Sequence, residues 1–442
     1  MSVAPLRRVL IVSPHFPPVN APDMQRVRMS LPSYRAYGWE PVVLCVGDEW
    51  QDGVREPALA ETIPPGLRVV RVPALPRQWT RLIGVGNLGL RCWLHFLFAG
   101  ARLIRREKID LVFFSNTQFV TFTLGRIWRF LYHVPYVFDL QDPWRTDYYE
   151  RPGSRRPPGG WKYQGARLVA WLLERWAFRH VRGVMSVSPD YLTNLQARYP
   201  WLAAVPQAVI GFGASREDSL AARRDESAPG HFSHGRGELH IVYTGASGPI
   251  LPHSLTVLFQ GLKRYHERSP ARARRLRFHF LGTSYVAPGQ GKNSVMPVAQ
   301  ACGVAEQVEE VPHRLGHLEC LRLQSEADIL LLPGSSDLAY SPSKIYPYYL
   351  SGRPMLGLVF KQSVMERLLD ELACAYVVRF SADGANDEAY ERLGRFFDLA
   401  FDGFPAGTLP SRNDSYFNRH YLAESLTGRQ CALFDHAVTG HA

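Results

Sequence analysis

Short segments rich in β-branched and apolar residues alternate with longer amphipathic segments along most of this 442-residue chain. This alternation predicts parallel β-sheets whose strands are joined by helices. Several of the short segments are apolar throughout, as expected for strands that are covered on both faces. The sequence therefore predicts an α/β protein built from doubly wound parallel sheets.

The expected strands fall into two series on either side of a polar stretch. The first series comprises residues 9–12, 41–46, 67–72, 110–114, 135–139, 184–187 and 208–210, and the second comprises 239–243, 276–281, 308–311, 328–332, 355–359 and 375–378. The stretch between them has no apolar period, which favours a linker or a long loop. We therefore expect an N-terminal domain over 1–213, a linker over 214–238, a second domain over 239–410, and a terminal helix over 411–442 that packs across either domain or crosses back to the N-terminal one.

Two such domains facing each other across a cleft would suit an enzyme with two substrates. In open parallel sheets, ligands bind beyond the carboxyl ends of the strands. The residues that follow each expected strand are therefore the candidates for function. The positions before the strands are more often structural.

The positive charge is concentrated in two segments of the N-terminal half. The net charge is +11, from 51 Lys and Arg against 40 Asp and Glu. Residues 77–108 hold seven basic residues against one acid and residues 145–182 hold nine against three, so each segment carries +6 and the remainder sums to −1. Trp and Leu are interleaved with these bases, which suits docking on an anionic membrane surface. An ordinary amphipathic helix is the alternative. Nucleic acid is not an expected partner, because no nucleic-acid-binding motif accompanies the charge.

Cysteine usage and apolar runs indicate the compartment. Six cysteines are scattered without a CxxC pair, and the N-terminus has no secretory pattern, so a reducing cytoplasm is expected. The longest apolar stretch, 88–100, contains Arg91 and His95 and is shorter than the roughly 20 residues of a membrane-spanning helix. We expect a cytoplasmic protein that lies peripherally at the inner face of the cytoplasmic membrane if the basic segments dock there.

Several catalytic motifs are absent from the sequence. It has no Walker lysine loop, no HExxH and no GxSxG. No Asp-x-Asp pair occurs, which disfavours a transferase that holds its nucleotide through Mg²⁺ or Mn²⁺, and no metal or other cofactor is expected. A GxGxxG match at 84–89 follows no convincing strand, so a flexible loop is favoured over a dinucleotide site.

Five segments that follow expected strands carry the functional signal. They are 14–28 with 37–44 (PHFPPVNAPDMQRVR and YGWEPVVL), 137–145 (VFDLQDPWR), 187–190 (VSPD), 243–248 (YTGASG) and 327–354, which ends in SPSKIYPYYLSGRP. In this order they resemble the GT-B glycosyltransferases of family 4, and in particular bacterial members with an FPPxGGxGxQR opening, a DxRDPW segment and a PxKxxEYLAxGKPIL donor loop. The resemblance spans about residues 8 to 435.

The resemblance implies two Rossmann-like domains and an enzyme of the hexosyltransferase type, as in polysaccharide biosynthesis. A sugar would pass from a nucleoside-diphosphate sugar, as co-substrate, to a glycan or lipid-linked acceptor, with retention of anomeric configuration. The donor would bind the C-terminal domain and the acceptor the N-terminal domain. Fixed cations and amide dipoles can stabilise a departing diphosphate without metal.

The donor loop supplies the main catalytic candidate. Lys344 is predicted to hold the diphosphate as a fixed cation where a helix begins, with Ser341, Ser343 and Ile345 beside it. A solvated lysine in the first turn of the helix is the alternative.

Glycines after the first two strands of the second domain are further donor candidates. Gly245 and Gly248 lack a Cβ, which permits close approach of a phosphate, although plain turns explain them nearly as well. Gly282, Thr283 and His313 follow the next strands and are predicted to contact the base or the ribose.

The acceptor candidates lie after strands of the first domain. Asp142 is the predicted catalytic carboxylate, which would accept a hydrogen bond from a sugar or acceptor hydroxyl, or act as a base. An ion pair with Arg145 or a helix cap is the alternative for Asp142. The other acceptor candidates are His15, Asn20, Arg26, Gln141 and Arg145. A packed loop histidine is the alternative for His15, and a surface salt bridge for Arg26.

The sequence departs from the family pattern at several positions. Ala339 and Pro347 stand where the donor loop of the family has two glutamates, the second of which binds ribose. Ala-Ser-Gly-Pro follows Gly245 in place of the usual Arg and Lys, and Gln141 replaces the expected arginine. A second hypothesis is therefore a catalytically inactive GT-B-like partner or regulatory protein. Retention of Ser343 and Lys344 favours an active enzyme.

Overall fold

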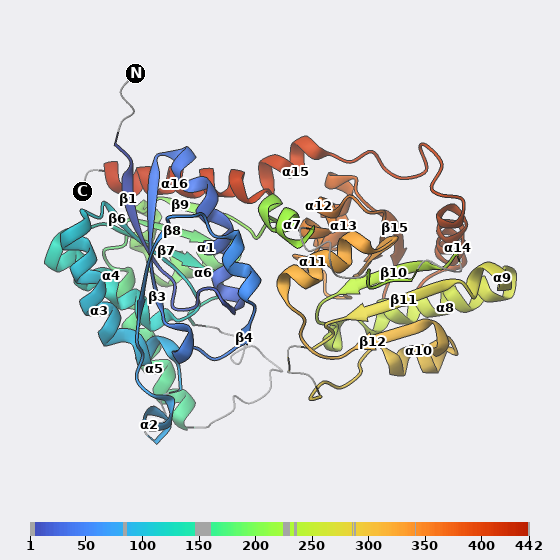
Figure 1. Ribbon diagram of the computed structural model, residues 1–442, viewed down its shortest axis with the longest axis horizontal. Coiled ribbons are helices and arrows are strands. Elements are labelled where there is room, and N and C mark those ends of the chain that lie inside the picture. The colour runs from blue at the N-terminus through green and yellow to red at the C-terminus, as the bar shows by residue number, and fades with distance from the viewer. Residues whose placement is uncertain are drawn as a thin grey trace. The chain divides into compact units, whose positions relative to one another are not determined.

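The computed structural model describes residues 5–82, 86–145, 161–223, 230–233, 237–284, 286, 289–340 and 342–440. The chain divides into two compact units (Figure 1). Unit 1 consists of Met1–Phe212 together with Ala423–Ala442, and unit 2 consists of Gly213–Leu422. Each unit contains its own parallel sheet, as the two series of apolar segments predicted.

Seven parallel strands form the main sheet of unit 1 among the described residues, in the order β5-β3-β1-β6-β7-β8-β9. Their bounds are β1 (Arg7–Val12), β3 (Trp39–Val46), β5 (Arg68–Val72), β6 (Leu111–Ser115), β7 (Tyr136–Leu140), β8 (Gly183–Ser186) and β9 (Gln207–Val209). A short antiparallel pair, β2 (Val19–Asn20) and β4 (Val54–Arg55), lies in the loops. All strands of the first expected series are confirmed.

Helices cover both faces of this sheet. On one face, Leu10 and Val12 share a core with α3 (Leu88–Glu107), α4 (Thr123–Tyr132), α5 (Trp161–Phe178) and α6 (Pro189–Arg198). On the other, Val9 and Ile11 share a core with α1 (Gln25–Ser30) and α16 (Ala423–Thr439). Alternate residues of one strand thus enter opposite cores, as the uniformly apolar segments predicted. Short helices complete the connections: η1 (Pro22–Met24), η2 (Leu31–Tyr37), η3 (Asp48–Trp50), η4 (Pro57–Thr62), α2 (Arg77–Leu82), η5 (Phe119–Phe122) and η7 (Pro200–Ala204).

The GxGxxG match lies between two helices. It follows α2, and its Asn87 caps α3 by accepting a hydrogen bond from the backbone N–H of Leu90. Gly84 lies outside the described residues. Because a dinucleotide fingerprint joins a strand to a helix, this segment is not one.

Six parallel strands form the sheet of unit 2 within the described ranges, in the order β12-β11-β10-β13-β14-β15. They are β10 (Leu239–Thr244), β11 (Leu276–Leu281), β12 (Val308–Val311), β13 (Ile329–Pro333), β14 (Met355–Phe360) and β15 (Tyr376–Phe380). The second expected series is confirmed. The helices of this unit are α7 (Arg216–Arg223), η8 (Gly248–Ile250), α8 (Pro252–Arg268), α9 (Pro270–Ala273), α10 (Met296–Cys302), η9 (Ala305–Gln307), α11 (His317–Glu326), α12 (Ile345–Ser351), α13 (Val364–Leu372), α14 (Asp387–Phe401) and α15 (Asp414–His420).

Two expectations about the connecting segments need correction. The polar stretch 214–238 is not a linker throughout, because residues 216–223 form α7, which packs on α11. Asp218 of α7 is buried and lies 2.9 Å from Nε2 of His317. The terminal segment is two helices, of which α15 belongs to unit 2 and α16 to unit 1.

Candidate functional site

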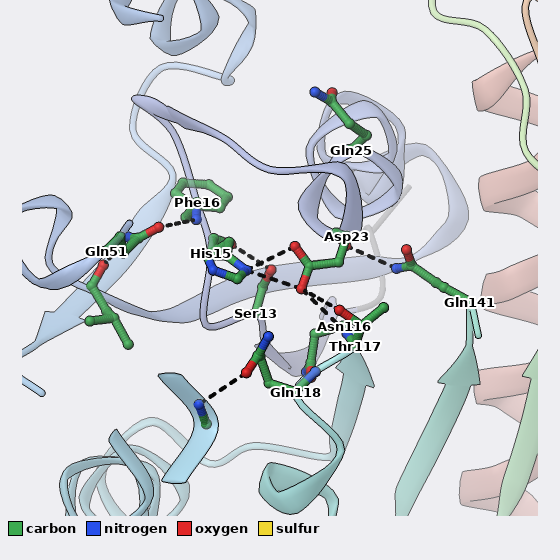
Figure 2. A network of polar contacts seen from close by, with 12 residues as sticks. Ser13, His15, Phe16, Asp23, Gln25, Gln51, Asn116, Thr117, Gln118 and Gln141 are labelled. Atoms are coloured by element: carbon green, nitrogen blue, oxygen red, sulfur yellow. Dashed lines mark hydrogen bonds and ion pairs between the residues drawn. The ribbon is translucent and has the colours of Figure 1, made fainter. Parts of the chain in front are cut away.

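Side chains from three loops of unit 1 converge on Asp23 beyond the carboxyl ends of β1, β6 and β7 (Figure 2). Nδ1 of His15 lies 2.9 Å from one carboxylate oxygen of Asp23. Thr117 donates to the other oxygen through its backbone N–H at 3.3 Å and through its hydroxyl at 3.1 Å. Nε2 of Gln141 donates to the backbone carbonyl of Asp23 at 2.9 Å. These contacts join the first loop of the unit to the ends of its central strands.

The carboxylate of Asp23 is buried but remains ionised. Burial alone raises the pKa of Asp23, but the hydrogen bond and charge of His15 and the two bonds from Thr117 outweigh it, so the pKa lies below its ordinary value. The ionised carboxylate accepts the Nδ1–H of His15 and thereby fixes the ring. Nε2 has no hydrogen-bond partner within the part of the chain that the structure describes. This histidine–carboxylate pair can accept a hydrogen bond or a proton from a hydroxyl.

Asp142 lies beside this cluster and is exposed. Burial of part of the side chain, followed by the charge of Asp23, raises the pKa of Asp142 above its ordinary value. No ion pair involving Asp142 is present among the described residues. The alternative of a pair with Arg145 is therefore not observed, and Asp142 remains a candidate hydrogen-bond acceptor.

Two acceptor candidates, Arg26 and Asn20, are corrected, because their polar groups are bonded inside the fold. Arg26 is buried, pairs with the buried Asp139 at 3.0 Å and donates to the carbonyl of Ile210 at 2.7 Å. Asn20 is buried and donates to Glu56 at 2.8 Å. These residues position the loops around the site rather than face a ligand.

Gln141 is also structural. The amide nitrogen of Gln141 donates to the carbonyl of Asp23 and to the hydroxyl of Ser115 at 3.1 Å, and the side chain is buried. The prediction that Gln141 contacts the acceptor directly does not fit this placement. Arg145 is half-buried near Tyr199, and its contact with the acceptor stays a prediction.

In unit 2, Lys344 lies beyond the carboxyl end of β10 and immediately precedes α12. Its Nζ lies 5.2 Å from the ring centroid of Tyr243. Neither an ion pair nor a hydrogen bond to its ammonium group is present among the described residues. Burial lowers the pKa of Lys344 to about 8. A partly buried cation without a counter-charge is suited to an anionic ligand.

Two glycine turns adjoin Lys344. Gly245 has a φ of 120°, and a Cβ on it would lie 2.2 Å from Cε of Lys344. Gly282 has a φ of 77°, and a Cβ there would lie 3.7 Å from the backbone nitrogen of Gly245. Only glycine therefore leaves the lysine side chain room to lie across the end of β10.

The remaining donor candidates differ in how accessible they are. Ile345 is corrected, because its side chain is fully buried and its N–H donates to the carbonyl of Pro342 at 3.2 Å. Thr283 is also corrected, because it is buried and donates to Glu310 at 2.8 Å. Ser343 is exposed and His313 is partly buried.

Gly248 and Ser341 complete the donor candidates. A Cβ on Gly248, whose φ is 48°, would have no atom within 4 Å, so this turn is open. Ser341 lies outside the described residues.

Sequence reasoning missed three residues of these sites. Asp23 was not among the predicted site residues, although an acid eight positions after His15 in one loop was the available signal. Thr117 gave no signal, because threonine is common after strands. The ring of Tyr243 contacts the ammonium group of Lys344. The signal available in the sequence was its position two residues before Gly245.

The positions of the missing glutamates lie near Lys344 in the sequence. Ala339 is exposed, and its N–H donates to Asp337 at 2.9 Å. Pro347 lies within α12, between the buried residues Tyr346 and Tyr348. Neither side chain offers an oxygen to a ribose.

Neither a metal-binding cluster nor a membrane-spanning helix is present among the described residues. No group of three or more His, Cys, Asp or Glu side chains in these ranges is arranged to hold a metal ion. None of the described helices is long and apolar enough to span a membrane.

Comparisons with known proteins identify a domain family and a fold. Residues 25–213 match the family of glycosyl transferase 4-like domains. The chain is similar to the sucrose-phosphate synthase of Thermosynechococcus elongatus, with 13% identity, a TM-score of 0.56, and coverage of 97% of this chain and 98% of that one. It is also similar to an α,α-trehalose-phosphate synthase of Burkholderia xenovorans, with 11% identity, a TM-score of 0.54, and coverage of 97% and 100%. No curated protein sequence matches the chain. The structural likenesses show the two-domain GT-B fold.

Proposed function

We propose that this chain, a glycosyltransferase of the GT-B fold with a family 4-like domain, transfers a sugar from a nucleoside-diphosphate sugar to a glycan or lipid-linked acceptor. The reaction proceeds with retention of configuration and without a divalent metal. Unit 2 holds the donor and unit 1 holds the acceptor. The chemistry of each unit's own site supports this division.

The burial of Lys344 without an acidic partner among the described residues is the observation that supports the proposal most strongly. A cation that is partly buried, with no acidic partner in the described part of the chain, pays a desolvation cost that an anionic ligand offsets. The absence of a Cβ at Gly245 gives the lysine side chain the space that it occupies at the strand end. When the sugar departs, negative charge grows on the diphosphate, and a cation fixed beforehand stabilises that charge more than it stabilises the ground state.

The Asp23 cluster supports the assignment of acceptor binding to unit 1. Asp23 fixes His15 so that Nε2 accepts a hydrogen bond from the acceptor hydroxyl and orients it for attack. Asp142 provides a second acceptor for a neighbouring hydroxyl, and its raised pKa keeps a share of the group protonated near acidic pH. Unit 1 therefore offers two hydroxyl-binding groups on one edge of its sheet.

An exposed apolar and basic surface of unit 1 supports a membrane-bound acceptor. Leu90, Leu94 and Phe98 form a stripe along the outer side of α3, where Phe98 is 71% exposed. Neighbouring helices α4 and α5 expose further large apolar residues: Phe130, Leu131, Leu168, Val169, Trp171, Leu172 and Trp176. The segments that contain α3 and α5 each carry a net +6. This combination suits the headgroup region of an anionic bilayer.

The missing glutamates favour a second candidate function, that of an inactive GT-B-like partner or regulator. Ala339 and Pro347 provide no carboxylate for a ribose, so nucleotide affinity rests on fewer groups. Such a protein would bind a nucleotide sugar without releasing its sugar. Binding and turnover therefore separate the two candidates.

Calorimetry with UDP, GDP, ADP, CDP and dTDP tests the donor site. We expect one of them to bind equally well with and without EDTA, and Lys344→Ala to weaken that binding by about 1.5 to 3 kcal/mol. Lys361→Ala, which removes an exposed lysine of the same unit, is the matched control and should leave the affinity unchanged. Loss of binding in EDTA would refute the metal-free mechanism, and equal affinities of the two variants would remove Lys344 from the site.

A further inference from the structure

A cavity of about 320 Å³ in unit 1 lies away from the Asp23 cluster. Its lining consists of Arg126, Arg129, Phe130, His133 and His180. These residues lie where α4 leads into β7 and α5 leads into β8, at the amino ends of the two strands. The sheet is parallel, and Asp23 lies beyond the carboxyl ends of its strands. The cavity therefore lies at the opposite ends of the strands and is separate from the acceptor site.

Basic groups dominate this cavity. Five of the described residues line it, of which four are Arg or His and none is acidic. Arg126 already has partners within the unit. It donates to the backbone carbonyl of Trp176 at 2.9 Å, and its guanidinium lies 4.6 Å from the centroid of the Trp176 ring. The side chains of Arg129 and His180 make no hydrogen bond or ion pair with other residues in the described ranges. Two basic side chains thus face the cavity without a protein partner.

The basic groups of the cavity interact unfavourably with each other. Burial, and then the charge of Arg182, lowers the pKa of Arg129. Burial, and then the charges of Arg126, Arg129 and Arg179, lowers the pKa of His180. Helix C-termini favour nearby cations, and the bond from Arg126 to the carbonyl of Trp176 accounts for that arginine in this way. Arg129 lies in the last turn of α4, where the helix C-terminus favours it in the same way, and a bound anion would further offset the repulsion between Arg129 and His180.

The apolar side of the cavity indicates what accompanies the anion. Phe130 lines the cavity and is 81% exposed, and Leu131 beside it is 52% exposed. Exposed aromatic and aliphatic groups next to a basic cavity match a phosphate that is attached to apolar chains. A soluble phosphate would use the basic groups alone.

We propose that this cavity is a phosphate-binding site, with Arg129 and His180 as the ligands of the phosphate and Phe130 in contact with an attached apolar group. The phosphate belongs either to an anionic lipid headgroup or to a soluble phosphate compound, and the basic groups recognise the same oxygens in both. The site goes beyond sugar transfer and does not depend on the donor or acceptor assignments.

Flotation with vesicles tests the lipid source, and calorimetry with inorganic phosphate tests the soluble source. The vesicles are equimolar phosphatidylcholine and phosphatidylglycerol, with pure phosphatidylcholine for comparison. The test variant is Arg129→Gln with His180→Gln. The control is Lys263→Gln with Arg274→Gln, which removes two exposed cations from unit 2, outside the two basic segments of unit 1. Thermal unfolding and nucleotide binding of each variant show whether the units remain intact.

For a lipid headgroup, we expect the test variant to bind the anionic vesicles about tenfold more weakly than the control variant. For a soluble phosphate, inorganic phosphate binds the native chain and the control but not the test variant, while vesicle binding is equal in both. The proposal is overturned if neither vesicles nor phosphate distinguish the test variant from the control. Nucleotide binding that persists in such a result would leave the proposed sugar transfer standing.

Discussion

Among single residues, Lys344 matters most, because the proposed binding of the diphosphate depends on its charge. Burial lowers the pKa of its ammonium group to about 8, and a bound diphosphate would raise that pKa because it favours the charged form. Binding above pH 8 must therefore take up a proton, so the affinity is greatest below that pH and falls as the pH rises through it.

Calorimetry with the cognate nucleotide sugar from neutral to alkaline pH checks this dependence. A nucleotide sugar is preferred to a free diphosphate because its phosphates do not titrate over that range. Lys344→Arg keeps the charge at every pH, so whatever affinity it retains should not change. An affinity of the native chain that stays constant into the alkaline range would contradict the assignment.

His15 and Asp23 form the second residue-scale prediction. His15→Gln should lower kcat by about a hundredfold, because the acceptor hydroxyl loses a positioned nitrogen acceptor. Asp23→Asn should lower kcat less, since an amide oxygen can still accept the Nδ1–H without stabilising a charged ring. Steady-state kinetics with each variant measure the effect, and donor affinity in unit 2 serves as the control. Full activity of His15→Gln would exclude the histidine from the reaction.

Sequence reasoning located the sites but not their internal bonding. The strand-end rule led to His15, Asp142 and Gly245, because those positions depend only on where strands end, and the donor-loop motif led to Lys344. It failed for Arg26, which is paired with Asp139 inside the unit, because burial of a charged pair leaves no periodic trace in the sequence.

At the scale of elements, the exposed stripe of α3 gives a test of membrane docking. Leu94→Ser with Phe98→Ser should reduce co-sedimentation with anionic vesicles, because both side chains are on the outer side of the helix and removing them costs buried apolar area at the interface. Leu220→Ser, at an exposed leucine of α7 in unit 2, is the matched control.

The salt dependence of vesicle binding separates the two contributions to docking. Binding that depends on the basic segments weakens as salt is added. Unchanged co-sedimentation of the double variant would refute the role of the stripe. Binding that is indifferent to lipid charge would refute the role of the basic residues.

The strands were predicted correctly, whereas the helix α7 in the connection between the two units was missed. Every expected strand is present because the segments are short and rich in β-branched and apolar residues, and several of them are apolar on both faces. Residues 216–223 were expected in a linker because their apolar face is small: Ala222 is buried, and the buried Asp218 contacts His317. A helix anchored by a polar contact gives little hydrophobic periodicity.

At the scale of the whole molecule, chain order and structural unit differ. Unit 1 is completed by α16, whose Phe434 is fully buried and lies 4.9 Å, centroid to centroid, from Phe113. The sequence predicted a terminal helix but not which sheet it covers, since an apolar face does not specify its partner. The uneven charge was visible in the sequence, and the structure places it on helices that also expose apolar side chains.

Release of nucleoside diphosphate by the 442-residue chain separates sugar transfer from nucleotide binding alone. UDP-, GDP-, ADP-, CDP- and dTDP-sugars would be incubated with the chain, with its Lys344→Ala variant and with the Lys361→Ala control. We expect one of these donors to release its nucleoside diphosphate with the native chain and with the control, in EDTA as well as without it. Lys344→Ala should abolish most of this release. Binding of a nucleotide sugar without any release from the whole panel, even with a membrane extract supplied as acceptor, would contradict it and identify the chain as an inactive GT-B protein.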